Sequence, residues 1–223
     1  SDSGVQEGCF VPVGPLRMIK ANAASNVRDL GGWKAQDGKS IAYGKLFRGT
    51  QTGSADHDLF VSLGISVDLD LRGNGGGSPS QVFSDLEYLN LKVYQFMYKG
   101  TSGYTEDLYR EALRRIIEWL DQGKGIYFHC IGGADRTGTL AFLIEALLGV
   151  EENDLNKDYE LTYFSSQPRT RDNTSDRPFR QLVFYMKTFP GSTPQEQVTN
   201  WATTGENALT LEEIQLLKEL MLE

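Results

Sequence analysis

Residues 125–149, GIYFHCIGGADRTGTLAFLIEALLG, combine three patterns that decide the fold. The short apolar run 125–130 lies between glycines, which is typical of a buried strand. Residues 137–149 are apolar on almost every side, which indicates a helix at the centre of the protein. The segment between them, residues 130–136, we call the cysteine loop. A buried strand that leads through a short loop into a buried helix is the unit from which α/β proteins are built.

The rest of the chain repeats this alternation. Strands are predicted at 41–49, 65–72 and 86–94, and in 65–72 the apolar residues alternate with Asp68, Asp70 and Arg72. Glycine and polar residues in the first forty positions suggest turns between short strands. We therefore expect an α/β fold with a central, mostly parallel sheet flanked by helices. The helices are expected at 54–64, 105–121, 137–149, 151–165, 178–188, 194–202 and 211–222.

Length and charge limit the classes of protein that fit. A chain of 223 residues without repeats predicts one domain, 1–223, with residues 1–20 as a mobile N-terminal extension. The formal net charge of −8 argues against a nucleic-acid partner, and no apolar run is long enough for stable membrane insertion. The N-terminus looks trimmed, so the compartment stays open between cytoplasmic and exported.

Two cysteines, Cys9 and Cys130, give neither a disulfide framework nor the spacing of a zinc site. No metal and no cofactor are predicted.

The cysteine loop has the composition of an anion site. Ligands of open α/β sheets bind where strands end and helices begin, and a helix N-terminus offers free N–H groups. Gly132 and Gly133 let the backbone curl so that these groups converge. Arg136 adds a fork of donors suited to two phosphate oxygens. The same positive field favours the thiolate of Cys130, which is the nucleophilic form of cysteine.

The motif HCIGGADRTG, residues 129–138, resembles the His-Cys-x5-Arg-Ser/Thr signature of the protein tyrosine phosphatase superfamily. It is closest to the atypical bacterial tyrosine/dual-specificity branch, whose usual form is His-Cys-x-Ala-Gly-Lys-Asp-Arg-Thr-Gly. Three further segments resemble that branch, namely NVRDLGGW (26–33), KLFRGTQ (45–51) and LGISVDLDLR (63–72).

This resemblance implies a two-step phosphomonoesterase, a protein tyrosine or dual-specificity phosphatase that uses a cysteinyl-phosphate intermediate and no metal. Cys130 would attack phosphorus, and Arg136 with the loop N–H groups would stabilise the charge on the phosphoryl oxygens. Thr137 would donate a hydrogen bond to the departing thiolate, and His129 would be a buried orienting residue. The residues implied to bind phosphate are Ile131, Gly132, Gly133, Ala134, Asp135 and Arg136.

The general acid stays open between two aspartates. The resemblance suggests Asp135, inside the motif, whose alternative role is a structural pair with Arg72 or Arg48. Asp70 is the second candidate, although a carboxylate that fixes Arg72 is the favoured interpretation. Arg28 and Asp29 would either line the pocket or brace a loop near it by pairing with each other.

The substrate class also stays open. Ala134 stands where the branch usually has lysine, which weakens the alternative of a phosphoinositide or inositol-polyphosphate phosphatase. A non-catalytic phosphate-binding module is a further alternative, against which the retained Cys130 and Arg136 argue. The partner in every case is a phosphorylated protein, small molecule or lipid.

Other features have ordinary interpretations beside functional ones. The segment GNGGG, 73–77, is interpreted as a flexible loop because no helix and lysine follow it. Cys9 could form a redox disulfide with Cys130, but its segment looks mobile. An arginine cluster, Arg169, Arg171, Arg177 and Arg180, fits a solvated loop or an overhang above the site. Tyr98, Tyr104 and Phe164 fit core positions or pocket walls.

Overall fold

The structure is a computed structural model that describes residues 17–35, 37–74, 76–94, 103–166, 168, 170 and 179–223. At its centre is a five-stranded sheet in the order β1-β2-β5-β3-β4. All neighbouring strands are parallel except β1, which runs antiparallel to β2. The predicted mostly parallel α/β sheet is confirmed. The strands are β1 (Arg28–Asp29), β2 (Leu46–Gly49), β3 (Ile65–Asp70), β4 (Glu87–Asn90) and β5 (Gly125–His129).

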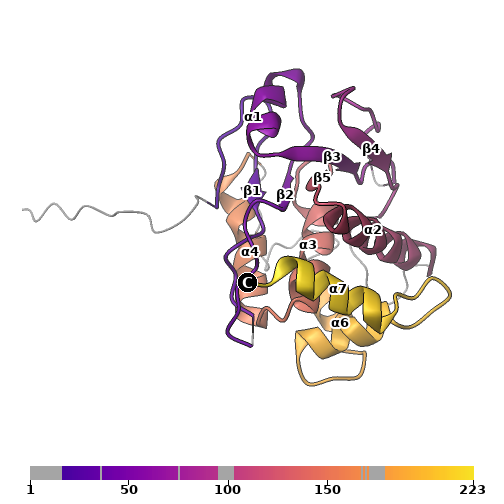
Figure 1. Cartoon of the computed structure of the whole chain (residues 1–223). Helices are drawn as coiled ribbons and strands as arrows, with labels where there is room; N and C mark the ends of the chain where they lie inside the picture. The colour runs from indigo at the N-terminus through magenta and orange to yellow at the C-terminus, as the bar shows by residue number, and fades with distance from the viewer. Residues whose placement is uncertain are drawn as a thin grey trace, which may run out of the picture.

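Helices cover the sheet unequally, as Figure 1 shows. The short helix α1 packs on one face, where Phe60 meets Phe47 and Tyr127 in a small apolar cluster. The larger core on the other face contains α2 and α3, with the C-terminal helices packed beyond them. The helices are α1 (His57–Ser62), α2 (Gly103–Asp121), α3 (Asp135–Leu147), α4 (Glu152–Glu160), α5 (Phe179–Met186), α6 (Pro194–Ala202) and α7 (Leu211–Met221).

The central strand and the central helix are both buried, as the sequence predicts. All five residues of β5 are buried, and so is every residue of α3 from Arg136 to Leu147. Because β5 lies between β2 and β3, its carboxyl end opens beside Gly49 and Asp70, where those strands also end. The fold thus places Cys130 at the middle of the carboxyl edge of the sheet.

Some elements differ from the sequence-based expectation. The predicted strand 41–49 is regular only from Leu46, because Ile41 pairs with Leu222 and Gly44 turns the chain at φ 78°. The polar side of β3 is buried, with Asp68 and Asp70 at most 1% exposed. The predicted helix 151–165 begins at Glu152, and after Glu160 it tightens into the 3-10 turn Leu161–Phe164.

The N-terminal extension is described only from Arg17 onward. Met18 bridges Arg28, and the N–H of Ile19 donates to the carbonyl of Val27 at 2.9 Å. Residues 17–20 are therefore attached to the sheet through β1. Among the helices that the structure describes, none is long and apolar enough to cross a membrane.

Candidate active site

The cysteine loop begins at Cys130, directly after β5, and ends at Arg136 in the first turn of α3. Both side chains are buried, each with 3% of the residue exposed. Gly133 adopts φ 61°, and a Cβ there would lie 2.5 Å from the backbone of Gly49. Only glycine fits that close approach, so the loop is pressed against the end of β2.

The carbonyl oxygens of the cysteine loop are bound by the surrounding protein. Gly133 O accepts hydrogen bonds from Asn26 Nδ2 at 2.9 Å and from Arg48 Nη2 at 3.0 Å. Ile131 O accepts from the backbone N–H of Gln51 at 3.3 Å. The donors come from the N-terminal segment, from β2 and from the residues after β2, all of which lie outside the loop.

The carbonyl at the start of α3 is bound as well, since Ala134 O accepts from Gly138 N at 2.7 Å. In a trans peptide the N–H points opposite to the carbonyl. The N–H groups of Gly132, Ala134 and Asp135 therefore point away from these donors, into the hollow of the loop. Converging N–H groups at a helix N-terminus form an anion-binding nest.

A buried ion network supports Gly133 from behind. Arg48 Nη1 lies 2.6 Å from Asp158 Oδ2, and Arg28 Nε lies 3.2 Å from Asp158 Oδ1. All three side chains are at most 1% exposed. Arg28 also bonds the side-chain oxygen of Asn26, the other donor to Gly133. One carboxylate on α4 thus fixes both groups that hold the Gly133 carbonyl.

The charges in this network shift the ionisation of its members. Burial raises the pKa of Asp158, but Arg28 and Arg48 outweigh it and hold that pKa below its usual value. Burial and the neighbouring Arg28 lower the pKa of Arg48 to about 10, although Asp158 opposes them. Glu145 on α3 is buried beside the same ionised Asp158, and both effects raise its pKa well above the usual value. The network therefore places two guanidinium groups against the Asp158 carboxylate, with the Glu145 carboxyl group buried beside it.

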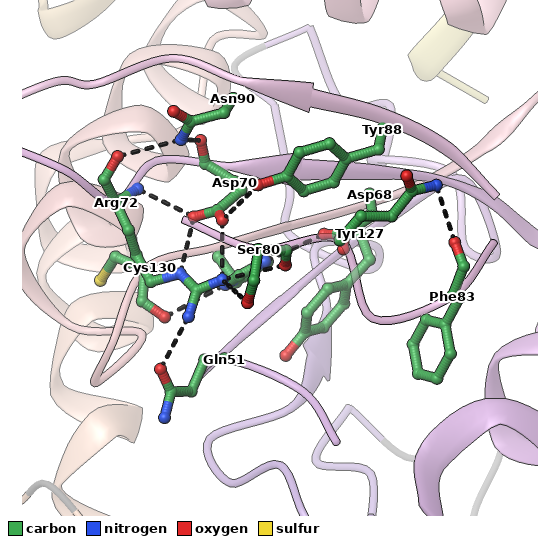
Figure 2. Close-up of polar contacts among 12 residues, drawn as sticks. Gln51, Asp68, Asp70, Arg72, Ser80, Phe83, Tyr88, Asn90, Tyr127 and Cys130 are labelled. Carbon is green, nitrogen blue, oxygen red and sulfur yellow. Dashed lines mark hydrogen bonds and ion pairs between the residues drawn. The ribbon is translucent and has the colours of Figure 1, made fainter. Parts of the chain in front are cut away.

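A second network fixes the end of β3, as Figure 2 shows. Asp70 accepts from Arg72 Nε at 2.9 Å and from Arg72 Nη2 and Tyr88 Oη, each at 2.8 Å. Arg72 Nη1 donates to Gln51 Oε1 at 2.9 Å, and Gln51 in turn binds the cysteine loop. Burial raises the pKa of Asp70, but the hydrogen bonds from Arg72 reverse that effect and leave it below the usual value.

His129 is the last residue of β5 and directly precedes Cys130. Its Nδ1 donates to the carbonyl of Cys130 at 3.1 Å, because a carbonyl oxygen can only accept. Its Nε2 lies 3.0 Å from Asp68 Oδ1, in a direction that does not form a hydrogen bond. The ring of Tyr127 stacks on the imidazole at 5.7 Å between centroids. The imidazole of His129 therefore has a contact at each ring nitrogen and a third contact with the ring of Tyr127.

Two polar groups at the start of α3 are buried and have no hydrogen-bond partner among the described residues. These are Nε of Arg136 and Oγ1 of Thr137. Arg136 Nη1, in contrast, donates to backbone carbonyls of the segment after β3. Buried donors are normally satisfied, so these two groups are candidates for hydrogen bonds to a bound ligand.

The structure brings most sequence-predicted site residues together. Arg28 and Asp29 do not pair with each other as considered from sequence, because Arg28 pairs with Asp158 and Asp29 accepts from Gly31 N and Gly44 N. Arg72 pairs with Asp70 and Arg48 pairs with Asp158. Asp135 is half-buried at the first position of α3. Cys9, Arg169, Arg171, Arg177 and Tyr98 lie outside the described residues, as does the side chain of Tyr104.

Sequence reasoning missed three supporting residues, Asn26, Gln51 and Asp158. Asn26 and Gln51 stand inside segments that the resemblance singles out, NVRDLGGW and KLFRGTQ. Asp158 begins the segment DYELTYF (158–164), which is similar to a later helix of the bacterial branch but much less specifically, and the polar residues around it do not separate it from a surface residue. Within the described part of the chain, no cluster of three or more His, Cys, Asp or Glu side chains could hold a metal ion.

Replacing Asp158 with Asn should destabilise the fold, because Arg28 and Arg48 then lose the carboxylate that compensates them. We expect the free energy of unfolding to fall by about 3–5 kcal/mol. The pKa of Asp158 is lower in the folded chain than in the unfolded chain. Its contribution is therefore present above pH ~4 and is lost as the pH falls below that value. Urea denaturation from pH 7 to pH 3 measures both effects.

Asp154→Asn is the matched control on the same helix. Asp154 pairs with Lys157 at 2.7 Å on the surface, and exposed pairs contribute about 0–1 kcal/mol. Equal losses in the two variants, or an Asp158→Asn protein with an unchanged pH dependence, would contradict this role for Asp158.

Two curated proteins with similar sequences carry the name tyrosine-protein phosphatase. The chain is 27% identical over 161 residues to a putative tyrosine-protein phosphatase of Cupriavidus necator, an alignment covering 60% of this chain and 59% of that protein. It is 25% identical over 166 residues to a tyrosine-protein phosphatase of Nostoc commune, covering 64% and 54% of the two chains. The chain thus spans less than two thirds of the length of either relative.

Among solved structures, the crystal structure of DUSP15 superposes with a TM-score of 0.49 at 15% identity, covering 82% of this chain and 94% of that one. The model of the tyrosine phosphatase family matches residues 19–205, which include the cysteine loop and both ion networks. The chain belongs to the tyrosine phosphatase family.

Proposed function

We propose that the protein is a cysteine-dependent phosphomonoesterase that acts as a protein tyrosine or dual-specificity phosphatase. The observation that carries the proposal is the orientation of the cysteine loop. The carbonyls of Ile131 and Gly133 are bound from outside the loop, so the N–H groups of Gly132 and Ala134, in the same peptides, point to its inside. Such a site stabilises a dianion and the extra charge that develops on its oxygens in the transition state.

In the first step the thiolate of Cys130 attacks phosphorus. The S–P bond forms as the bond between phosphorus and the leaving oxygen breaks, and that oxygen takes a proton from a general acid. We assign the acid to Asp135. The depressed pKa of Asp70, which follows from its bonds to Arg72, supports this choice because an ionised carboxylate has no proton to give.

In the second step water attacks the phosphorus of the cysteinyl phosphate. Asp135, now ionised, accepts a proton from the water, the S–P bond breaks and inorganic phosphate is released. The departing thiolate needs a donor, and the buried hydroxyl of Thr137 supports this role because its oxygen has no partner among the described residues. The step consumes one water and regenerates Cys130.

The surroundings of the loop favour an aryl phosphate over a polyphosphate. Ala134 is 4% exposed and brings no charge to the rim, whereas Ile131 and Phe164 are 39% and 77% exposed. The exposed apolar side chain of Ile131, which belongs to the cysteine loop itself, suits the ring of a phosphotyrosine.

Cys130→Ser tests the nucleophile. We expect hydrolysis of p-nitrophenyl phosphate to fall by on the order of a thousandfold or more, because a hydroxyl is a far weaker nucleophile than a thiolate. The assay is run with EDTA, which should leave the wild-type rate unchanged. Cys9→Ser is the matched control and should keep full activity. Substantial activity in Cys130→Ser, or loss of wild-type activity in EDTA, would refute the proposal.

Asp135→Asn and Asp70→Asn separate the two candidate acids. Phenyl phosphate needs a protonated leaving group far more than p-nitrophenyl phosphate does. We expect Asp135→Asn to lower kcat for phenyl phosphate about 10²–10⁴-fold and to affect p-nitrophenyl phosphate much less. Asp70→Asn should lower both rates by a similar factor, because it loosens Arg72. The assignment fails if Asp70→Asn is the variant that discriminates between the substrates.

A further inference from the structure

The glycine-rich segment after β3 contacts the arginine of the cysteine loop. Arg136 Nη1 lies 3.0 Å from Gly76 O, 3.1 Å from Asn74 O and 3.4 Å from Leu71 O. We call these three backbone oxygens the carbonyl cradle. They bind one end of the Arg136 guanidinium, a planar group whose five N–H donors point in fixed directions. Fixing Nη1 therefore fixes where Nε and Nη2 point.

We propose that the carbonyl cradle is a positioning element that holds the Arg136 guanidinium in the orientation for binding the phosphoryl group. The inference rests on the proposed function, since it assigns the free end of Arg136 to the substrate. Arg136 is only 3% exposed, and its buried Nε has no partner among the described residues. A phosphoryl oxygen would satisfy that donor.

The chemistry of the cradle suits this task. A carboxylate in the same place would neutralise the guanidinium and compete with the substrate for it. Backbone carbonyls are neutral acceptors, so they orient Arg136 and leave its full charge to the substrate dianion. The arginines behind the loop, Arg28 and Arg48, are instead paired with a carboxylate.

The cradle depends on the glycines of its segment. Gly73, Gly76 and Gly77 have φ values of 125°, 104° and 81°, which side-chain-bearing residues rarely adopt. A Cβ on Gly77 would lie 2.7 Å from the side chain of Ile131 in the cysteine loop. The segment therefore packs directly on the loop, in a conformation that glycine permits.

Neighbouring strands brace the segment. Gly73 and Gly76 form an antiparallel bridge, and the side-chain amide of Asn74 donates to the carbonyl of Lys92. Asn90 Nδ2, on β4, donates to Asp70 O at 2.8 Å and to Arg72 O at 2.9 Å. These contacts connect three described residues of the segment, Gly73, Asn74 and Gly76, to one another and to residues of β4 and after it.

Gly76→Ala tests the cradle. A Cβ there meets only Ile131 at 3.7 Å, so the variant mainly strains the backbone and turns the Gly76 carbonyl. We expect the inhibition constant of inorganic phosphate, measured against p-nitrophenyl phosphate, to rise about tenfold. We expect kcat/KM to fall about 10–100-fold. The inhibition constant does not depend on the folded fraction, so a purely structural role would leave it unchanged.

Gly123→Ala is the matched control. Gly123 has φ 73° with nothing within 4 Å of an added Cβ, and it lies near the opposite end of β5 from Cys130. Gly123→Ala should lower Tm about as much as Gly76→Ala does, and it should leave the inhibition constant of phosphate unchanged. If Gly76→Ala does not fold, Asn74→Ala removes the anchor to Lys92 and should raise the inhibition constant about threefold. If Gly76→Ala folds, or Asn74→Ala in its place, an unchanged inhibition constant of phosphate in that variant would overturn the proposal.

A double-mutant cycle with Arg136→Lys decides whether the cradle acts through Arg136. If it does, adding Gly76→Ala to Arg136→Lys should lower kcat/KM by less than about threefold, because the group that it positions is already gone. If Gly76→Ala lowers kcat/KM by the same factor in the Arg136→Lys protein as in the wild type, the proposal is overturned. Loss of activity in Arg136→Lys with none in Gly76→Ala would refute only the cradle, whereas an inactive wild type would refute the proposed function.

Discussion

The active-site geometry depends on the capture of one carbonyl, that of Gly133. If this oxygen turned inward, it would repel a phosphate and remove the N–H of Ala134 from the anion nest. Arg48 and Asn26 hold it outside, and Asp158 compensates the charge that this buried arginine brings. Arg48 is fully buried, so its binding depends on that carboxylate. A residue on α4 thus controls the shape of a loop that it does not belong to.

The arginines around the site are divided between two tasks. Arg28, Arg48 and Arg72 are paired with carboxylates, Asp158 and Asp70, and their charges serve the fold. Arg136 is held by neutral backbone oxygens. This division leaves the charge of Arg136 uncompensated at the cysteine loop, although the chain has a net charge of −8. In the proposed function, this local charge, and not the overall charge, attracts the phosphoryl group.

Much of this arrangement could be predicted from sequence. The strand, loop and helix of residues 125–149 have strong local patterns, and the last helix, expected at 211–222, is α7 (Leu211–Met221). What escaped prediction depends on contacts between distant residues. Asp158 meets Arg48 across 110 positions, and Asn26 meets Gly133 across 107. The contacts of Asn74 with Lys92 and of Gly77 with Ile131 likewise join segments that the local sequence does not connect.

The central claim is that Cys130 carries the phosphoryl group between the two steps of the reaction. The most direct test is to quench the enzyme with acid during turnover of p-nitrophenyl phosphate and locate the bound phosphoryl group by peptide mass spectrometry. The account predicts one phosphoryl group on the peptide that contains Cys130, in the form of an S–P bond. A phosphoryl group on another residue, or turnover without any covalent intermediate, would contradict it.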